Sequence, residues 1–196
     1  MTATAAPPCS DDLAVRLLGA REAARDLARS SDAARNAALE SIAVALERDA
    51  VALAAANAAD MADAEQGVAR GELAPPLLQR LALDAARVRG LAGAVRQVAA
   101  LDDPIGRRTL HRELDAGLVL DRVTCPIGVI GVIFESRPDV LVQIASLAIK
   151  SGNAVVLKGG AEARRSNRAL FETVRDAVAV TSSGRGGRSS RGTPRT

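Results

Sequence analysis

Two short segments of this chain carry residue types suited to binding a charged ligand. The first is Lys158-Gly159-Gly160, which directly follows the apolar run 154–157. Glycines let a backbone approach a ligand closely and leave its N–H groups able to donate. A lysine supplies a point charge for a phosphate, or hydrogen bonds to a ribose hydroxyl. The alternative is that the glycines only form a turn and that Lys158 is a solvated surface residue.

The second segment is Glu135-Ser136-Arg137-Pro138, which follows the apolar run 126–134. The guanidinium of Arg137 could hold a carboxylate or a phosphate through two parallel hydrogen bonds. The alternative is a surface pair between Glu135 and Arg137, with a neighbouring Ser or Asp as the cap of the following helix.

The cysteines and the single histidine predict no catalytic centre. Cys9 and Cys125 are the two cysteines, too few for a four-ligand zinc site or for stapling a fold of this length. Cys125 precedes a proline at the start of an apolar run, so we expect a buried structural thiol. His111 alternates within a hairpin strand and is expected to be solvated. We predict no metal site, no Ser/His/Asp set and no paired carboxylates.

The net charge is misleading until the chain is divided. It is +3 overall, with 26 Lys+Arg against 23 Asp+Glu. Residues 181–196 hold four arginines and no acid, so the rest of the chain sums to −1. With no Trp, no Tyr and two Phe, the chain has no stacking platform for single-stranded nucleic acid. We therefore expect no nucleic-acid partner.

The sequence shows no membrane segment and no export signal. Its longest apolar runs, 126–134 and 140–149, are shorter than the roughly 20 residues that span a bilayer. No Lys or Arg stands in residues 1–15, where an export signal would carry one. At 48% apolar and 25% charged, the composition is that of a globular chain. We predict a cytoplasmic protein.

The first hundred residues predict a layer of helices. Apolar residues recur at helical spacing in three stretches, 13–27, 39–53 and 77–98. Ser10 and Ser31 stand where they could cap the first two helical regions. The third region ends at Pro104. This layer supplies packing and, by its residue types, no chemistry.

The pattern changes after Pro104. Thr109–Leu114 and Leu118–Val123 are extended runs on either side of a turn sequence, which predicts a hairpin. The uninterrupted β-branched run 126–134 is typical of a strand buried on both faces of a parallel sheet.

A helix over 138–150, a second strand over 154–157 and a helix over 164–180 follow in turn. This strand–helix–strand–helix order predicts an α/β fold, with the helical layer packed on a partial doubly wound parallel sheet.

Ligands of such sheets bind beyond the carboxyl ends of the strands. Both charged segments stand there, 134–138 after the first strand and 158–162 after the second. The Gly-x-Gly-x-x-Gly fingerprint and the P-loop motif are absent, so this expectation rests on position alone.

The same segments closely resemble the γ-glutamyl phosphate reductase family, also called glutamate-5-semialdehyde dehydrogenase, of the aldehyde dehydrogenase superfamily. The resemblance is carried by 125–140, 150–163 and Ser166-Asn167, and it extends over 11–180. Glu-Ser-Arg-Pro together with Gly-Asn-Ala-Val-Val-Leu-Lys-Gly-Gly is specific, because other aldehyde dehydrogenases have Trp-Asn and Lys-Pro at these places. The resemblance is to the amino-terminal part of the chains of this family.

The resemblance implies NADPH-dependent reduction of L-glutamyl 5-phosphate to L-glutamate 5-semialdehyde and phosphate, a step of proline biosynthesis. In that reaction a cysteine thiolate attacks the acyl phosphate, and hydride reduces the resulting thioester. The family also implies a homo-oligomer in its full-length members and channelling with glutamate 5-kinase. The implied NADP(H) contacts are Lys158, Gly159, Gly160, Glu162 and Glu135, and the implied substrate contacts are Ser136 and Arg137.

Two departures from the family stand out. Family chains are over twice as long and carry their nucleophilic cysteine beyond the end of this sequence, and neither Cys9 nor Cys125 matches it. After Val180 the sequence turns to Ser, Gly and Arg, which predicts disorder over 181–196. A frameshift or premature end would explain this change, and a purposeful basic tail is the rival explanation.

These features predict three parts and leave three functions open. The parts are a disordered leader (1–10), a partial NADP-binding domain (11–180) with a hairpin at 109–123, and a disordered tail (181–196). The functions are a truncated form of the reductase without its catalytic cysteine, a non-catalytic NADP-binding or oligomerisation module, and a nucleic-acid binder through the tail. The body charge of −1 and the lack of aromatics disfavour the third.

Overall fold

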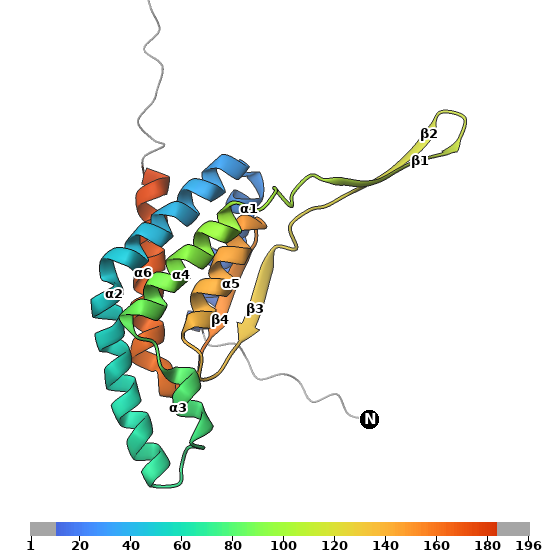
Figure 1. Ribbon diagram of the computed structural model, residues 1–196. Helices are drawn as coiled ribbons and strands as arrows, with labels where there is room; N and C mark the ends of the chain where they lie inside the picture. Colours follow the sequence, from blue (N-terminus) through green and yellow to red (C-terminus); the bar gives the residue numbers. More distant parts are fainter. Residues whose placement is uncertain (1–10, 184–196) are drawn as a thin grey trace, which may run out of the picture.

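The computed structural model describes residues 11–183 (Figure 1). The leader at 1–10 with its Ser10 cap, Cys9, and the tail at 184–196 lie outside the described residues. The elements are α1 (Asp11–Arg29), α2 (Asp32–Ala69), α3 (Pro76–Leu81), α4 (Ala85–Ala99), β1 (Arg108–Asp115), β2 (Leu118–Val123), β3 (Val129–Ile133), α5 (Asp139–Lys150), β4 (Ala154–Lys158), the 3₁₀ turn η1 (Ala161–Ala163) and α6 (Arg164–Ser183).

The helical layer forms as the apolar spacing predicts, but two of its helical regions begin and end at places that the spacing does not show. Ser31 caps α2 by accepting from the backbone N–H of Ala34, and α2 runs as one continuous helix of 38 residues. The third helical region is divided into α3 and α4, because Asp84 caps α4 by accepting from the N–H of Arg87 at 2.7 Å. The sequence pattern alone does not show this second start.

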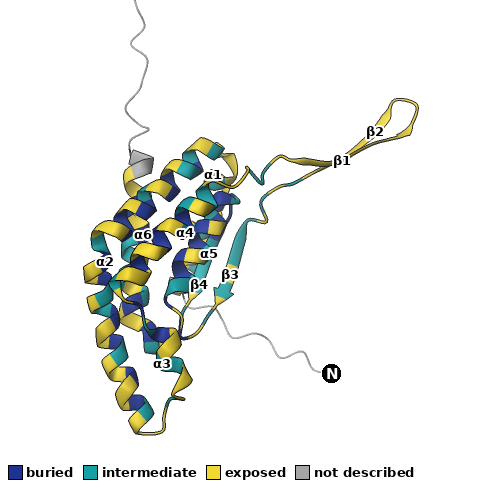
Figure 2. Cartoon of the chain, viewed as in Figure 1, coloured by how far each residue is buried: buried dark blue, intermediate teal, exposed yellow. Residues whose placement is uncertain are grey.

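The core lies between α2, α4, α5 and α6, whose facing sides are buried (Figure 2). Its fully buried members include Leu39, Ile42, Leu46, Val88, Val95, Val142 and Leu170. The apolar spacing over 39–53 and over 138–150 puts Val51 and Leu147 on the inward faces of their helices, but they are 73% and 52% exposed. In α5, Val142 and Ala145 take the inward places instead.

Helix α1 covers the strands rather than the helical core. It packs against β3 and β4, and Ala24 is its one buried residue over 13–29. The expected apolar face is only partly used, since Leu13 and Leu17 are exposed.

The strands form two separate pairs. β3 and β4 are parallel and joined by α5, which confirms the predicted strand–helix–strand unit. β1 and β2 form the predicted antiparallel hairpin, which projects from the helices and is exposed along both strands (Figure 1). The expectation that the first strand is buried on both faces was wrong. β3 is half exposed because, within residues 11–183, its sheet has only two strands.

A buried ammonium group joins the ends of three helices. The Nζ atom of Lys150, which is 3% exposed, donates to Asp32 Oδ1 at 2.8 Å, to Asn36 Oδ1 at 2.9 Å and to the Ala99 carbonyl at 3.1 Å. A fully buried Lys is rare unless it is paired. These three bonds therefore fix the last turn of α5 against the start of α2 and the end of α4.

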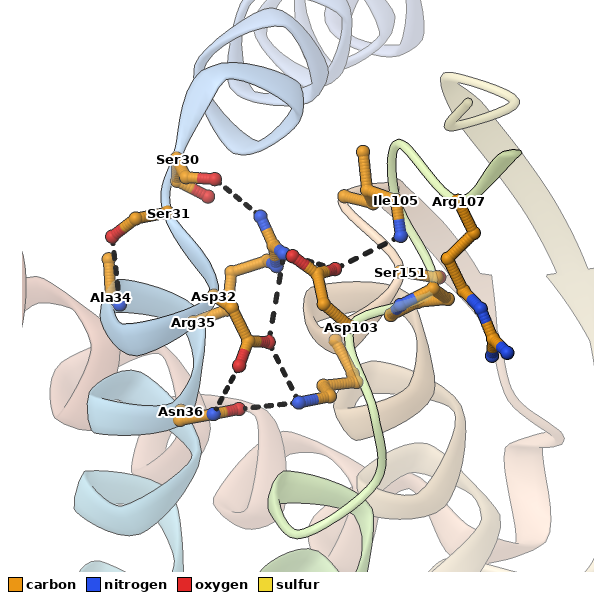
Figure 3. A network of polar contacts seen from close by, with 12 residues as sticks. Ser30, Ser31, Asp32, Ala34, Arg35, Asn36, Asp103, Ile105, Arg107 and Ser151 are labelled. Carbon is orange, nitrogen blue, oxygen red and sulfur yellow. Dashed lines mark hydrogen bonds and ion pairs between the residues drawn. The ribbon is translucent and has the colours of Figure 1, made fainter. Parts of the chain in front are cut away.

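A second buried cation, Arg35, extends this network toward the hairpin (Figure 3). Its guanidinium donates to the carbonyl of Ser30 and, at 2.7 Å, to Asp103 Oδ1, which also accepts from the N–H of Ile105 at 3.0 Å. The network thus orders both the α1–α2 junction and the chain that leads from α4 to β1.

The charge of this network depends on Asp32. A hydrogen bond from Lys150 is the main cause that holds the pKa of Asp32 below its ordinary value, and burial opposes it. A lowered pKa in the folded state stabilises the fold above the unfolded-state pKa. That contribution disappears as the pH falls through the folded-state value.

Lys150→Met should lower the free energy of unfolding by about 2 kcal/mol or more, because it leaves buried acceptors without a donor and Asp32 without its cation. Chemical denaturation measures this change. The matched control is Lys158→Met, an exposed lysine that should change stability by about 0.5 kcal/mol at most. Equal losses in the two variants would contradict a structural role for the Lys150 network.

Candidate functional site

Parallel pairing of β3 and β4 brings the two predicted segments side by side. Ile133 pairs with Lys158 in the register, and the N–H of Phe134 donates to the Lys158 carbonyl at 3.0 Å. The turn after β3 and the turn after β4 therefore start from the same edge of the sheet, as the strand order predicts.

A carboxylate joins the two turns. Oε1 of Glu162 accepts from the backbone N–H of Ser136 at 2.6 Å and from its Oγ at 2.9 Å. Ser136 is 3% exposed and has a φ of +50°, in the left-handed region that favours glycine. Glu162 thus stabilises an unfavourable backbone conformation at the start of the Ser136-Arg137-Pro138 turn.

The surroundings of Glu162 favour its charged form. Burial raises its pKa, but hydrogen bonds from its own N–H and from Ser136, together with the positive charge of Lys158, outweigh burial and hold the pKa below the ordinary value. The carboxylate is therefore ionised at neutral pH, and its second oxygen carries negative charge beside Gly160.

The two glycines stand where there is no room for a side chain, because Asn167 and Glu162 occupy the place that a Cβ would take. A Cβ at Gly159 would stand 2.3 Å from Asn167 Nδ2, and one at Gly160 would stand 2.1 Å from Glu162 Oε1. Asn167 Oδ1 is buried without a hydrogen-bond partner in the described residues. An unsatisfied buried acceptor beside two bare backbone positions fits a site that receives a polar ligand.

The remaining predicted residues are placed differently. Lys158 and Glu135 are exposed at the mouths of the two turns. Arg137 is also exposed and donates to Asp139 Oδ2 at 3.0 Å, while Ser136 turns inward to Glu162. Helix α5 has no side-chain cap, so the alternative role of Ser136 or Asp139 as a cap is not realised.

The expectation for Cys125 was wrong, because its thiol is exposed. The residue lies in the segment that links the projecting hairpin to β3, outside the packed layers. His111 is exposed, as expected, and its Nδ1 lies 2.6 Å from Asp121 Oδ1 on the neighbouring strand.

Residues 11–183 hold no group of three or more His, Cys, Asp or Glu side chains placed to hold a metal ion. No helix in that part is both long and apolar enough to cross a bilayer.

Known proteins are similar to this chain in sequence and in structure. No protein-family model matches the chain. It is 51% identical over 173 residues to a γ-glutamyl phosphate reductase from Synechococcus sp. (strain WH7803), which covers 88% of this chain and 39% of that protein. The crystal structure of γ-glutamyl phosphate reductase from Saccharomyces cerevisiae superimposes with a TM-score of 0.82 at 38% identity, over 92% of this chain and 45% of that one.

This chain belongs to the γ-glutamyl phosphate reductase family. It spans about 39% of the length of the curated relatives it matches. A succinic semialdehyde dehydrogenase from Streptococcus pyogenes, solved in complex with NADP+, shares the fold, with a TM-score of 0.62 at 21% identity over 89% of this chain and 35% of that one. The predicted α/β class and the reductase family are thus confirmed.

Two features of the site are not visible in the sequence. Asn167 was seen as part of the family motif but given no role, because its contact with Gly159 crosses from α6 to the end of β4. Arg80 and Arg87 were placed in a layer without chemistry, yet they line one pocket with Arg137. Only packing between distant segments shows these neighbours.

Glu162→Ala should raise the hydrogen-exchange rate of the Ser136 amide by about tenfold or more, because that N–H loses a charged acceptor. Exchange followed by NMR measures the change. Glu162→Gln keeps an acceptor oxygen and should retain most of the protection. Glu172→Ala, an exposed glutamate of α6, is the control. An unchanged Ser136 rate in Glu162→Ala would show that the two turns are held by other contacts.

Proposed function

We propose that this chain forms the NADP(H)-binding part of an enzyme that reduces L-glutamyl 5-phosphate to L-glutamate 5-semialdehyde in proline biosynthesis. The observation that carries this proposal is the meeting of the Lys158–Glu162 and Glu135–Arg137 turns at one edge of the parallel pair. Residues 11–180 would be the binding domain, with 1–10 and 181–196 as appended segments.

The residues present fit the adenosine end of NADP(H). Lys158 offers an exposed cation for a phosphate or a ribose hydroxyl. Gly159 and Gly160 let the backbone lie against Asn167 and Glu162, and Asn167 supplies an unsatisfied acceptor. Glu162 engages Ser136 through Oε1, which leaves Oε2 to accept from a ribose hydroxyl.

Glu135 is the second carboxylate at this edge. It is exposed and forms no ion pair with the described residues, so its oxygens are free to accept a hydrogen bond from the cofactor. When bound, NADPH supplies hydride for the reduction. The chain's own residues hold the cofactor and neutralise its charge.

Ser136 and Arg137 are the proposed substrate contacts. Arg137 is exposed and donates one N–H to Asp139. The other N–H groups of its guanidinium are therefore available to donate to an oxyanion. Ser136 places this arginine by fixing the turn before it. A cytoplasmic location, a homo-oligomeric full-length form and channelling with glutamate 5-kinase belong to the same proposal.

A non-catalytic NADP-binding or oligomerisation module is the second candidate. The hairpin favours it, because β1 and β2 project from the body with Leu110, Leu118 and Leu120 all exposed. Exposed apolar side chains on a strand pair are typical of surfaces that meet another chain.

Lys158→Ala should weaken NADPH binding to the full 196-residue chain by about tenfold, because a charge-assisted hydrogen bond is lost. Added salt should weaken binding to the original chain and have less effect on the variant, since salt screens the lost attraction. Calorimetry measures both. Arg112→Ala, which removes an equal charge from the exposed hairpin, is the control. Equal affinity of the original chain and Lys158→Ala would remove Lys158 from the site.

This chain alone should not catalyse the reaction. Removing a nucleophile commonly costs about four to six powers of ten in rate, and neither Cys9 nor the exposed Cys125 matches the nucleophile of the family. The assay follows phosphate-dependent oxidation of glutamate semialdehyde with NADP, alongside Cys9→Ser and Cys125→Ser. Turnover that survives purification and disappears in one cysteine variant would contradict this expectation.

A further inference from the structure

Three arginines from separate parts of the chain line one pocket. The pocket has a volume of about 400 Å³ and lies between α3, α4 and the start of α5. Arg80 comes from the last turn of α3, Arg87 from the first turn of α4, and Arg137 from the turn after β3. Figure 1 shows α3 close to the segment from which α5 begins. Small-molecule sites commonly have volumes of roughly 300–1,000 Å³.

The lining carries an excess of positive charge. Asp139 is the one carboxylate among the described lining residues, against three guanidinium groups. Asp139 Oδ2 already accepts from Arg137 and, at 3.0 Å, from Gln143. The pocket is therefore left with a net charge of about +2 by this count.

Two of the three guanidinium groups are held in place while keeping donors in reserve. Arg137 donates one N–H to Asp139, and Nη1 of Arg87 donates to the Ala82 carbonyl at 2.5 Å. Each guanidinium has five N–H donors in a fixed fork, so most of them are left for a ligand. The side chain of Arg80 makes no hydrogen bond or ion pair with any described residue.

Helix stability does not explain the place of Arg87. A positive side chain in the first turn of a helix opposes the helix dipole and costs a few tenths of a kcal/mol. Gly90, one turn further along α4, leaves open space where a side chain would otherwise narrow the pocket. The positive charge of Arg87 and the open space beside Gly90 together indicate that these positions serve to bind a ligand rather than to pack the helix.

We propose that Arg80 and Arg87, together with Arg137, bind an oxyanion of the substrate, a carboxylate or a phosphate. The identity of the substrate rests on the proposed function, because L-glutamyl 5-phosphate carries both groups. Arginine is well suited to this task, since its planar fork matches either oxyanion through paired hydrogen bonds. Arg80 and Arg87 are thereby specificity residues that the helical layer contributes to the site.

The test titrates the full 196-residue chain with inorganic phosphate and, separately, with L-glutamate at low ionic strength, by calorimetry. Arg80→Gln and Arg87→Gln should each weaken saturable binding by about tenfold, because a charge-assisted bond is lost. The matched control is Arg89→Gln, an exposed arginine of α4 outside the pocket, which should change affinity less than about twofold. Thermal melting of all three variants checks that each is folded.

Three outcomes would overturn the proposal: no saturable binding of either anion up to about 50 mM, unchanged affinity in Arg80→Gln and Arg87→Gln, or an equal loss in Arg89→Gln. Preference for phosphate assigns the pocket to the phosphate end of the substrate, and preference for L-glutamate assigns it to the carboxylate end.

NADPH titrations of the same variants keep this result separate from the proposed function. Arg80→Gln and Arg87→Gln should bind NADPH as the original chain does, and Arg112→Ala on the exposed hairpin should bind both NADPH and the anions unchanged. Anion binding without NADPH binding would leave the pocket standing and contradict the cofactor proposal.

Discussion

The arrangement of this molecule depends on one buried ammonium group. Lys150 ends α5, and its three acceptors come from the start of α2 and the end of α4. β4 begins four residues later, at Ala154. Because that short turn leaves little slack, fixing the end of α5 also fixes where β4 enters the sheet. Burying a cation is costly unless every donor is matched, so the network favours one position of α5 over neighbouring ones.

The register of β3 against β4 carries this constraint to the site. Ile133 pairs with Lys158, so the two turns leave the sheet together and Ser136 meets Glu162. A parallel strand shifted by two residues would move its turn by about 7 Å. The Ser136–Glu162 bonds would then break, and the left-handed Ser136 would lose the contact that stabilises it. The packing of Lys150 at the end of α5 thus helps to determine which side chains meet in the turns beside the start of α5.

Most elements of the fold were predictable from the sequence. The features that were not predictable have one physical cause in common. Helical spacing, the hairpin turn and the strand–helix–strand order depend on neighbours along the chain, and they were found. The burial of Lys150, the contact of Asn167 with Gly159 and the gathering of Arg80 near Arg137 depend on distant segments. Cys125 was judged by the apolar run after it, whereas its exposure comes from its place beside a projecting hairpin.

The site combines a rigid base with open binding groups. Ser136 is buried and Glu162 is half-buried between the turns, while Lys158, Glu135 and Arg137 are exposed. Exposed charges cost little free energy in the free protein because water solvates them. Their attraction to a ligand becomes stronger when the ligand excludes that water. Hydrogen bonds from its own N–H and from Ser136, with a smaller contribution from the Lys158 charge, hold the pKa of the half-buried Glu162 carboxyl below its ordinary value. Glu162 is therefore the residue through which the shape of the turn after β3 and the charge at the end of β4 depend on each other.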